Sequence, residues 1–182
     1  MDCDNNLHIL AANQGDPELA EELILSGKYG IDDVNKSGFT PLLLAVINKN
    51  PELVALLLKY GADVNKKNKN GNTALHQAVI NDFSKIKNGI EMVKFLLANG
   101  ADVDSRNNNG DTALHLAVKN CHKNMVVLLI EKGANPWLKN NSGKTPIGFA
   151  DDKLKEKYIS AEDNKQYIEI KKLLIKYADD AS

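Results

Sequence analysis

Apolar residues recur along the chain in short runs with helical spacing, and residues that start or end helices bound each run. The run LVALLL at 53–58 follows an Asn-Pro pair at 50–51, a capping residue and a first-turn proline. Gly61 comes just after it, at the left-handed position where helices commonly end. A shorter run at 41–46 follows Thr40, whose hydroxyl can cap a helix N-terminus. The pattern predicts two short helices joined by a loop.

This helix pair is repeated along the chain. The segments GFTPLLLAV, GNTALHQAV, GDTALHLAV and GKTPIGFAD align, and their threonines lie 33, 39 and 33 residues apart. The longer interval is 33 residues plus six, at about 84–89, which we expect in the loop between two helices. Eight of the 12 glycines occupy only two equivalent positions, one after the second helix and one in a tight turn. Each unit is therefore predicted to be helix, loop, helix and an extended, hairpin-like finger.

With these repeats, the sequence resembles the ankyrin repeat family. The resemblance rests on T-A-L-H-x-A segments at 73–78 and 112–117, and on GADVN-type endings at 61–65, 100–104 and 133–137. It implies an all-α repeat solenoid, an ankyrin-repeat array of about five helix-loop-helix units with short hairpin fingers and atypical end caps. It implies no particular reaction, because the family shares an architecture and not a chemistry.

We expect residues 1–182 to form one domain. The predicted units are an N-terminal cap repeat at about 5–34, internal repeats at 35–67, 68–106 and 107–139, and an extended C-terminal cap repeat at 140–182. The last unit carries about 12 extra residues, mostly in the charged stretch 151–165, which suits an end repeat that needs a polar outer face.

Composition narrows the functional classes. The chain has 23 Lys and Arg against 24 Asp and Glu, and a net charge of −1 argues against a nucleic-acid or membrane-surface binder. No apolar run approaches the roughly 20 residues of a membrane span, and the acidic N-terminus lacks the pattern of a signal peptide. Two cysteines provide no disulfide framework. We expect a monomeric cytoplasmic protein, with a nuclear or host-cell location left open.

No constellation in the sequence predicts catalysis or a cofactor. His76 and His115 stand in the same place in two repeats, three residues after a capping threonine. A metal or catalytic histidine is the alternative, but the resemblance implies that each histidine hydrogen-bonds the threonine and a neighbouring loop. Cys121 and His122 lack further ligands at zinc-site spacing. The residues assigned structural roles are Thr40, Thr73, His76, Thr112, His115 and Thr145.

Binding is the favoured function, because a solenoid leaves an extended concave surface exposed. The resemblance implies that partners contact the fingers and the exposed ends of the first helices. The finger candidates are Lys36, Phe39, Lys67, Lys69, Asn70, Asn72, Arg106, Asn108, Asp111, Lys139 and Lys144, and the helix-end candidates are Ile47, Ile80 and Lys119. Seven of these residues are basic and one is acidic, which predicts an acidic, partly apolar protein partner. A solubilising charged rim is the alternative.

Trp137 stands where two other units have Asn65 and Asp104. Tryptophan is enriched at interface hot spots, so Trp137 is a further binding candidate, unless it packs on the C-terminal cap. The sequence thus predicts a non-enzymatic protein–protein interaction module. One alternative is a subunit or host-directed effector of a microbe, parasite or virus, which the 22 asparagines and abundant Lys and Ile favour. An enzyme built on the repeat scaffold is the other.

Overall fold

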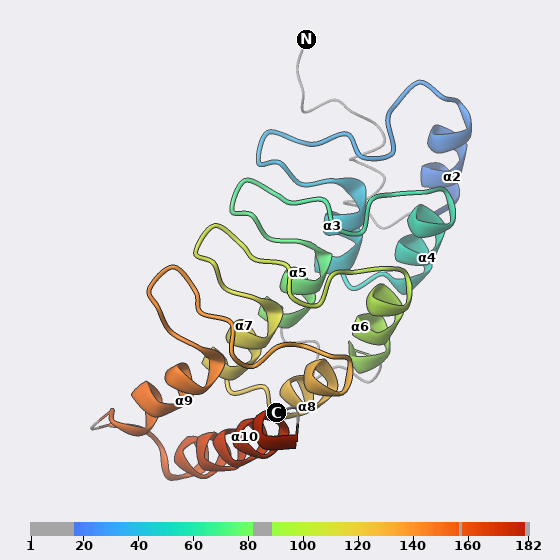
Figure 1. Ribbon diagram of the computed structural model, residues 1–182. Coiled ribbons are helices and arrows are strands. Elements are labelled where there is room, and N and C mark those ends of the chain that lie inside the picture. Colours follow the sequence, from blue (N-terminus) through green and yellow to red (C-terminus); the bar gives the residue numbers. More distant parts are fainter. Residues whose placement is uncertain (1–16, 82–88, 157, 181–182) are drawn as a thin grey trace.

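The computed structural model describes residues 17–81, 89–156 and 158–180, and nine helices lie within these ranges (Figure 1). They are α2 (Pro17–Leu25), α3 (Pro41–Ile47), α4 (Pro51–Lys59), α5 (Ala74–Ile80), α6 (Gly89–Ala98), α7 (Ala113–Lys119), α8 (Lys123–Glu131), α9 (Pro146–Leu154) and α10 (Ala161–Asp180). No β-strand occurs in this part of the chain.

The helices form two rows (Figure 1). In the inner row α3, α5, α7 and α9 pack on one another in chain order, and each packs on the helix that follows it in the outer row. At the N-terminal end, α2 packs on α4. The all-α repeat array predicted from the sequence is therefore confirmed, as four helix pairs and α2. The predicted partner of α2 falls in residues 1–16, outside the described residues.

Local sequence explains where the helices begin. The Thr40 hydroxyl accepts a hydrogen bond of 3.2 Å from the backbone N–H of Leu43, and Pro41 fills the first helical position. The side chain of Asn50 caps α4 in the same way, with a bond of 2.9 Å. Each cap satisfies a backbone donor that a helix N-terminus otherwise leaves without a partner.

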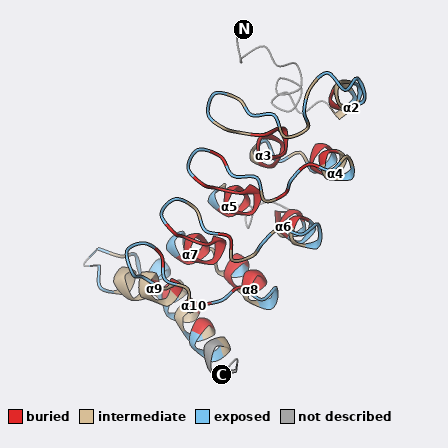
Figure 2. Ribbon diagram, turned by 45° about the horizontal axis from the view of Figure 1, so that its top comes forward, coloured by how far each residue is buried: buried red, intermediate tan, exposed pale blue. Residues whose placement is uncertain are grey.

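The hydrophobic core lies between the two rows (Figure 2). Leu57, Leu96 and Leu129 occupy equivalent places in three outer helices, and all three are fully buried. Burying one leucine side chain contributes about 2 kcal/mol, so each added repeat extends one continuous core.

Four fingers leave the helices on one side of the array (Figure 1). We name them the first to fourth fingers, comprising residues 31–39, 64–72, 103–111 and 136–144. Each connects an outer helix to the next inner helix. The six-residue insertion lies between α5 and α6; residues 82–88 are outside the described ranges, and Gly89 begins α6.

The C-terminal repeat departs from the others in length. α9 has nine residues where the other inner helices have seven, and α10 has 20 residues. Tyr167, Ile170 and Leu174 bury one face of α10. An ion pair of 2.5 Å between Lys123 and Glu169 joins α10 to α8.

Candidate binding surface

An asparagine folds each finger. Asn107 lies three residues before Gly110, and its Oδ1 accepts hydrogen bonds of 3.0 Å from the backbone N–H groups of Asn109 and Asp111. The equivalent residues of the other fingers, Asn35, Asn68 and Asn140, each accept the same two bonds at 2.9–3.0 Å. One side-chain oxygen thus holds the two arms of each finger together.

The same asparagines join one finger to the preceding one. Asn107 Nδ2 donates 3.0 Å to Asn72 Oδ1, and Asn140 Nδ2 donates 2.7 Å to Asp111 Oδ1. Asn72 and Asp111 are buried by this contact; Asp111 is only 3% exposed. This corrects the predicted surface, because neither side chain is available to a partner.

Backbone bonds strengthen the later junctions between fingers. The N–H of Asn108 donates to the carbonyl of Asn70 at 3.1 Å, and the N–H of Asn141 donates to the carbonyl of Asn109 at 3.0 Å. A Cβ added at Gly71 would lie 2.6 Å from the backbone nitrogen of Asn108, so only glycine permits this approach.

His76 and His115 are structural links between repeats. His76 Nδ1 lies 3.3 Å from the Thr73 backbone N–H donor, and its Nε2 lies 3.0 Å from the carbonyl oxygen of Asp111. His115 makes the equivalent contacts: its Nδ1 faces the backbone N–H of Thr112, and its Nε2 lies 3.0 Å from the carbonyl oxygen of Lys144. Since Nδ1 accepts and Nε2 faces an acceptor, the neutral Nε2–H tautomer fits both sites. Burial lowers the pKa of both histidines, which favours the neutral form.

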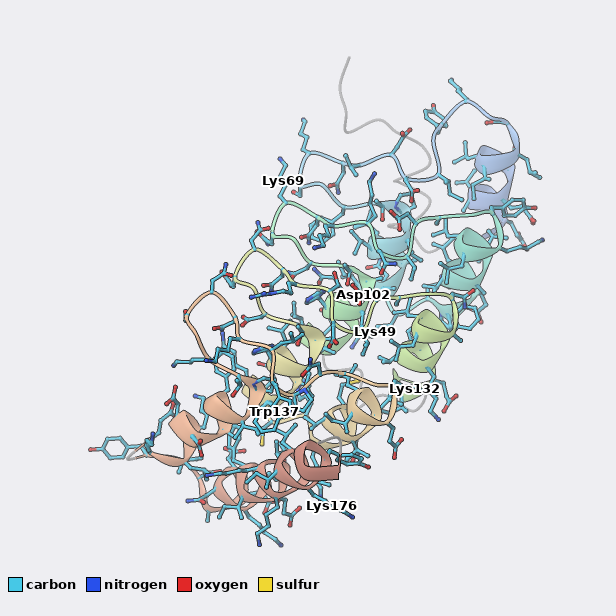
Figure 3. All side chains as sticks on the ribbon, viewed as in Figure 1. Lys49, Lys69, Asp102, Lys132, Trp137 and Lys176 are labelled. Carbon is cyan, nitrogen blue, oxygen red and sulfur yellow. The ribbon has the colours of Figure 1, made fainter. Side chains whose placement is uncertain are left out.

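The predicted basic side chains of the fingers are exposed, and three of them reach neighbouring fingers. Lys67 Nζ donates to the carbonyl of Arg106 at 2.8 Å, and Arg106 Nη2 donates to the carbonyl of Lys139 at 2.6 Å. Lys69 Nζ, on the second finger (Figure 3), donates to the carbonyl of Lys36. A bond to a carbonyl leaves the positive charge in place, so the row stays basic.

At the C-terminal end of this row the charge has intramolecular partners. Lys144 forms an ion pair with Asp152, and this hydrogen bond lowers the pKa of the Asp152 carboxyl. The ammonium groups of Lys119 and Lys144 lie 5.8 and 5.7 Å from the centre of the Phe149 ring. Among the described residues, Lys67, Lys69 and Arg106 form no ion pair, so the basic charge is most available on the second and third fingers.

Three apolar side chains belong to the same predicted surface. Ile80, at the end of α5, is 42% exposed, and Ile47 and Phe39 are half-buried. We name the exposed or half-buried basic, apolar and asparagine side chains among the predicted residues of the fingers and inner helix ends the finger face. Its members are Lys36, Phe39, Ile47, Lys67, Lys69, Asn70, Ile80, Arg106, Asn108, Lys119, Lys139 and Lys144.

A scan against protein-family models matches ankyrin repeats over residues 7–86 and 83–155, most of the chain. The protein belongs to the ankyrin repeat family. The helix pairs, the fingers and the histidine links described above are thus those of an ankyrin-repeat array of four to five units.

Individual relatives share only part of this ankyrin array. Protein phosphatase 1 regulatory subunit 27 of mouse is 38% identical over 73 residues, 40% of this chain and 47% of that protein. A fowlpox virus ankyrin repeat protein, FPV240, is 43% identical over 67 residues, 37% of this chain and 16% of that protein. An NAD-dependent deacetylase of Dictyostelium discoideum, sir2B, is 39% identical over 59 residues, 32% of this chain and 8% of the enzyme. The chain thus aligns with less than half the length of each.

Trp137 is 55% exposed in the connection after α8 (Figure 3). At its place in earlier ankyrin repeats, Asn65 Oδ1 accepts from the backbone N–H of Asp102 at 2.8 Å, and Asp104 Oδ1 accepts from Asn135 at 2.9 Å. The segment LLIKYADD at 173–180 aligns with LLLKYGAD at 56–63, so Asp180 is the counterpart of the donors Asp102 and Asn135, and it lies inside α10. Within the described residues, Trp137 therefore has no equivalent link to a following loop.

Cys121 does not have the properties of a reactive thiol. Cys121 Sγ lies 3.5 Å from Gln166 Oε1, and burial raises the pKa of the thiol to about 11, so it is protonated at neutral pH and a weak nucleophile. A cavity of about 410 Å³ beside it is lined by Asn120, Cys121, His122, Lys123, Asn124, Asp163 and Gln166. Across the described ranges, no three His, Cys, Asp or Glu side chains gather as metal ligands.

The four asparagines that fold and join the fingers were not among the residues predicted from the sequence. Asn35, Asn68, Asn107 and Asn140 repeat at intervals of 33, 39 and 33 residues, always three positions before a turn glycine. The same periodicity that located the threonines could have found them.

None of the helices that the structure describes is long and apolar enough to cross a lipid bilayer.

Proposed function

We propose that this ankyrin-repeat protein is a non-enzymatic module that binds another protein through its finger face. One observation carries the proposal: all seven predicted basic residues are exposed, whereas the single predicted acid, Asp111, is buried. Among these predicted residues the exposed charge is therefore wholly basic, and Ile80 is an exposed apolar residue of the same finger face. This combination suits an acidic, partly apolar protein surface.

Physical chemistry assigns different roles to the two kinds of side chain. Exposed charges act over about 8 Å at physiological ionic strength, so the lysines mainly raise the association rate. Apolar side chains that lose water on binding slow dissociation. The proposed complex involves no nucleic acid, membrane or cofactor, and the free protein is a cytoplasmic monomer.

Site-specific photo-crosslinking tests the proposed face. A photoreactive phenylalanine analogue is placed at Ile80 on the finger face or, as the matched control, at Phe95 on the outer helix α6, which is 39% exposed. Irradiation in cells should attach a protein to position 80 and not to position 95. The salt dependence of association is then measured for the attached protein, with Lys67→Glu/Lys69→Glu as the charge-reversed variant. Equal crosslinking at both positions, or an association rate unaffected by salt and charge reversal, would refute the proposal.

A further inference from the structure

The junction between the first and second fingers lacks a bond that both later junctions have. Asn68 is only 6% exposed, and its Nδ2 has no hydrogen-bond partner among the residues described. In the later junctions, the equivalent amide donates to Asn72 or Asp111 on the preceding finger. Phe39 stands at that position in the first finger, so the chain supplies no acceptor there. A buried amide without an acceptor carries a substantial desolvation cost.

Two other links of the later junctions are also missing from the first. Within the described residues, no backbone bond runs from Lys69 N–H to the first finger, although the equivalent N–H groups of Asn108 and Asn141 both bond the finger before them. Leu43 occupies the place of His76 and His115, so no imidazole reaches the second finger. The first finger is therefore held less firmly than the others.

Two lysines lie at this junction. Lys36 on the first finger and Lys69 on the second are both exposed, and Lys69 Nζ donates to the backbone carbonyl of Lys36. In the part of the chain that the structure covers, Lys69 forms no ion pair with a carboxylate, in contrast to Lys144 on the fourth finger. A buried donor amide with nearby ammonium groups is the environment that carboxylates bind.

We propose that the junction of the first two fingers is a binding site for an Asp or Glu carboxylate of the partner protein, which deepens the proposed function and rests on it. The incoming oxygen accepts the hydrogen bond from Asn68 Nδ2 that Asp111 accepts from Asn140 within the chain itself. Lys69, whose Nζ lies at the first finger, balances the charge. The half-buried ring of Phe39 turns outward on binding and contacts the apolar part of the partner.

Nuclear magnetic resonance on the full ¹⁵N-labelled chain tests this site with defined probes. Acetyl-hexaglutamate amide should shift the Asn68 side-chain amide resonances with saturation, and acetyl-hexaglutamine amide should leave them unchanged. Asn68→Asp keeps the oxygen that folds the finger but removes the donor, so hexaglutamate binding, followed in this variant by the backbone amide resonances of the first two fingers, should weaken at least about tenfold. Hexaglutamate binding that leaves the Asn68 amide signals unmoved would overturn the proposal.

A matched pair of variants separates the site from general charge attraction. Phe39→Asp places a carboxylate within the chain where Asp111 stands in the third finger, and it should weaken hexaglutamate binding at least about tenfold. Ser37→Asp adds the same charge to the same exposed finger without reaching the amide, and should weaken binding only about twofold. Equal weakening by the two variants would overturn the site.

The two proposals fail in different ways. Crosslinking at position 80 without an Asn68 response to hexaglutamate would overturn the carboxylate site alone. A saturable Asn68 response without crosslinking at position 80 would support the site and reject the wider finger-face function.

Discussion

The Asn140 amide donates a hydrogen bond of 2.7 Å to the Asp111 carboxylate, and both side chains are buried at the junction of the third and fourth fingers. The equivalent donor at the first junction, Asn68 Nδ2, faces a finger whose corresponding residue is Phe39. The repeat array therefore contains, within one chain, both the satisfied and the unsatisfied form of the same contact.

We expect Phe39→Asp to be more stable than Phe39→Ala by about 1.5 kcal/mol. Both variants lose the half-buried ring, so the comparison isolates the new acceptor for Asn68 Nδ2. Urea unfolding at neutral pH measures the difference. If the alanine variant is as stable as the aspartate variant, the first junction does not accept a carboxylate and the amide is satisfied by other means.

Asn107→Ala should lower the unfolding free energy by about 2–3 kcal/mol, because it removes the acceptor of two backbone N–H groups and the link to Asn72. Asn109→Ala, on the exposed turn of the same finger, is the control and should change stability by less than about 0.5 kcal/mol. Chemical denaturation of both variants checks this. A loss in Asn107→Ala no larger than that in Asn109→Ala would show that the Asn107 hydrogen bonds contribute little to the stability of the fold.

Much of the fold could be predicted from the sequence because its signals are local. Thr40 and Asn50 cap the helices that their spacing predicted, and the two sets of glycines all have positive φ. Residues a few positions apart determine these features, so periodicity reveals them directly.

The binding surface was less predictable because it depends on contacts between repeats. Asn72 and Lys69 lie three positions apart and both suit an exposed finger, yet only Lys69 is exposed. The difference arises from the Asn107 amide, 35 residues further along, which buries Asn72. The sequence also left open whether Trp137 packs on the C-terminal repeat, and its side chain is more than half exposed.

Acid should destabilise the array through His76 and His115. Burial lowers the pKa of both histidines in the folded state, so the unfolded chain binds more protons below its histidine pKa of about 6.5. Their contribution to stability is complete above that pH and is lost as the pH falls below it. The unfolding free energy should therefore decrease between about pH 7.5 and about pH 5.5.

His76→Leu/His115→Leu is the control for this pH dependence, since Leu43 stands at the same position in the first repeat. The double variant should be less stable at neutral pH, because it loses both links, but it should lose less stability on acidification. Urea unfolding at the two pH values gives both quantities. An unchanged decrease in the double variant would assign the pH dependence to other groups.

Trp137 is the only tryptophan, so its fluorescence reports directly on this site. Because its side chain is 55% exposed, the free protein should show red-shifted emission and efficient quenching by acrylamide. Trp137→Asn introduces the residue found at Asn65 and should change the unfolding free energy by less than about 1 kcal/mol, since little packing is lost. A partner that covers the fourth finger should shift the emission to the blue and protect it from quenching, while a partner confined to the first two fingers should leave both unchanged. A loss of several kcal/mol in Trp137→Asn would instead show that the indole packs on the C-terminal repeat and holds it in place.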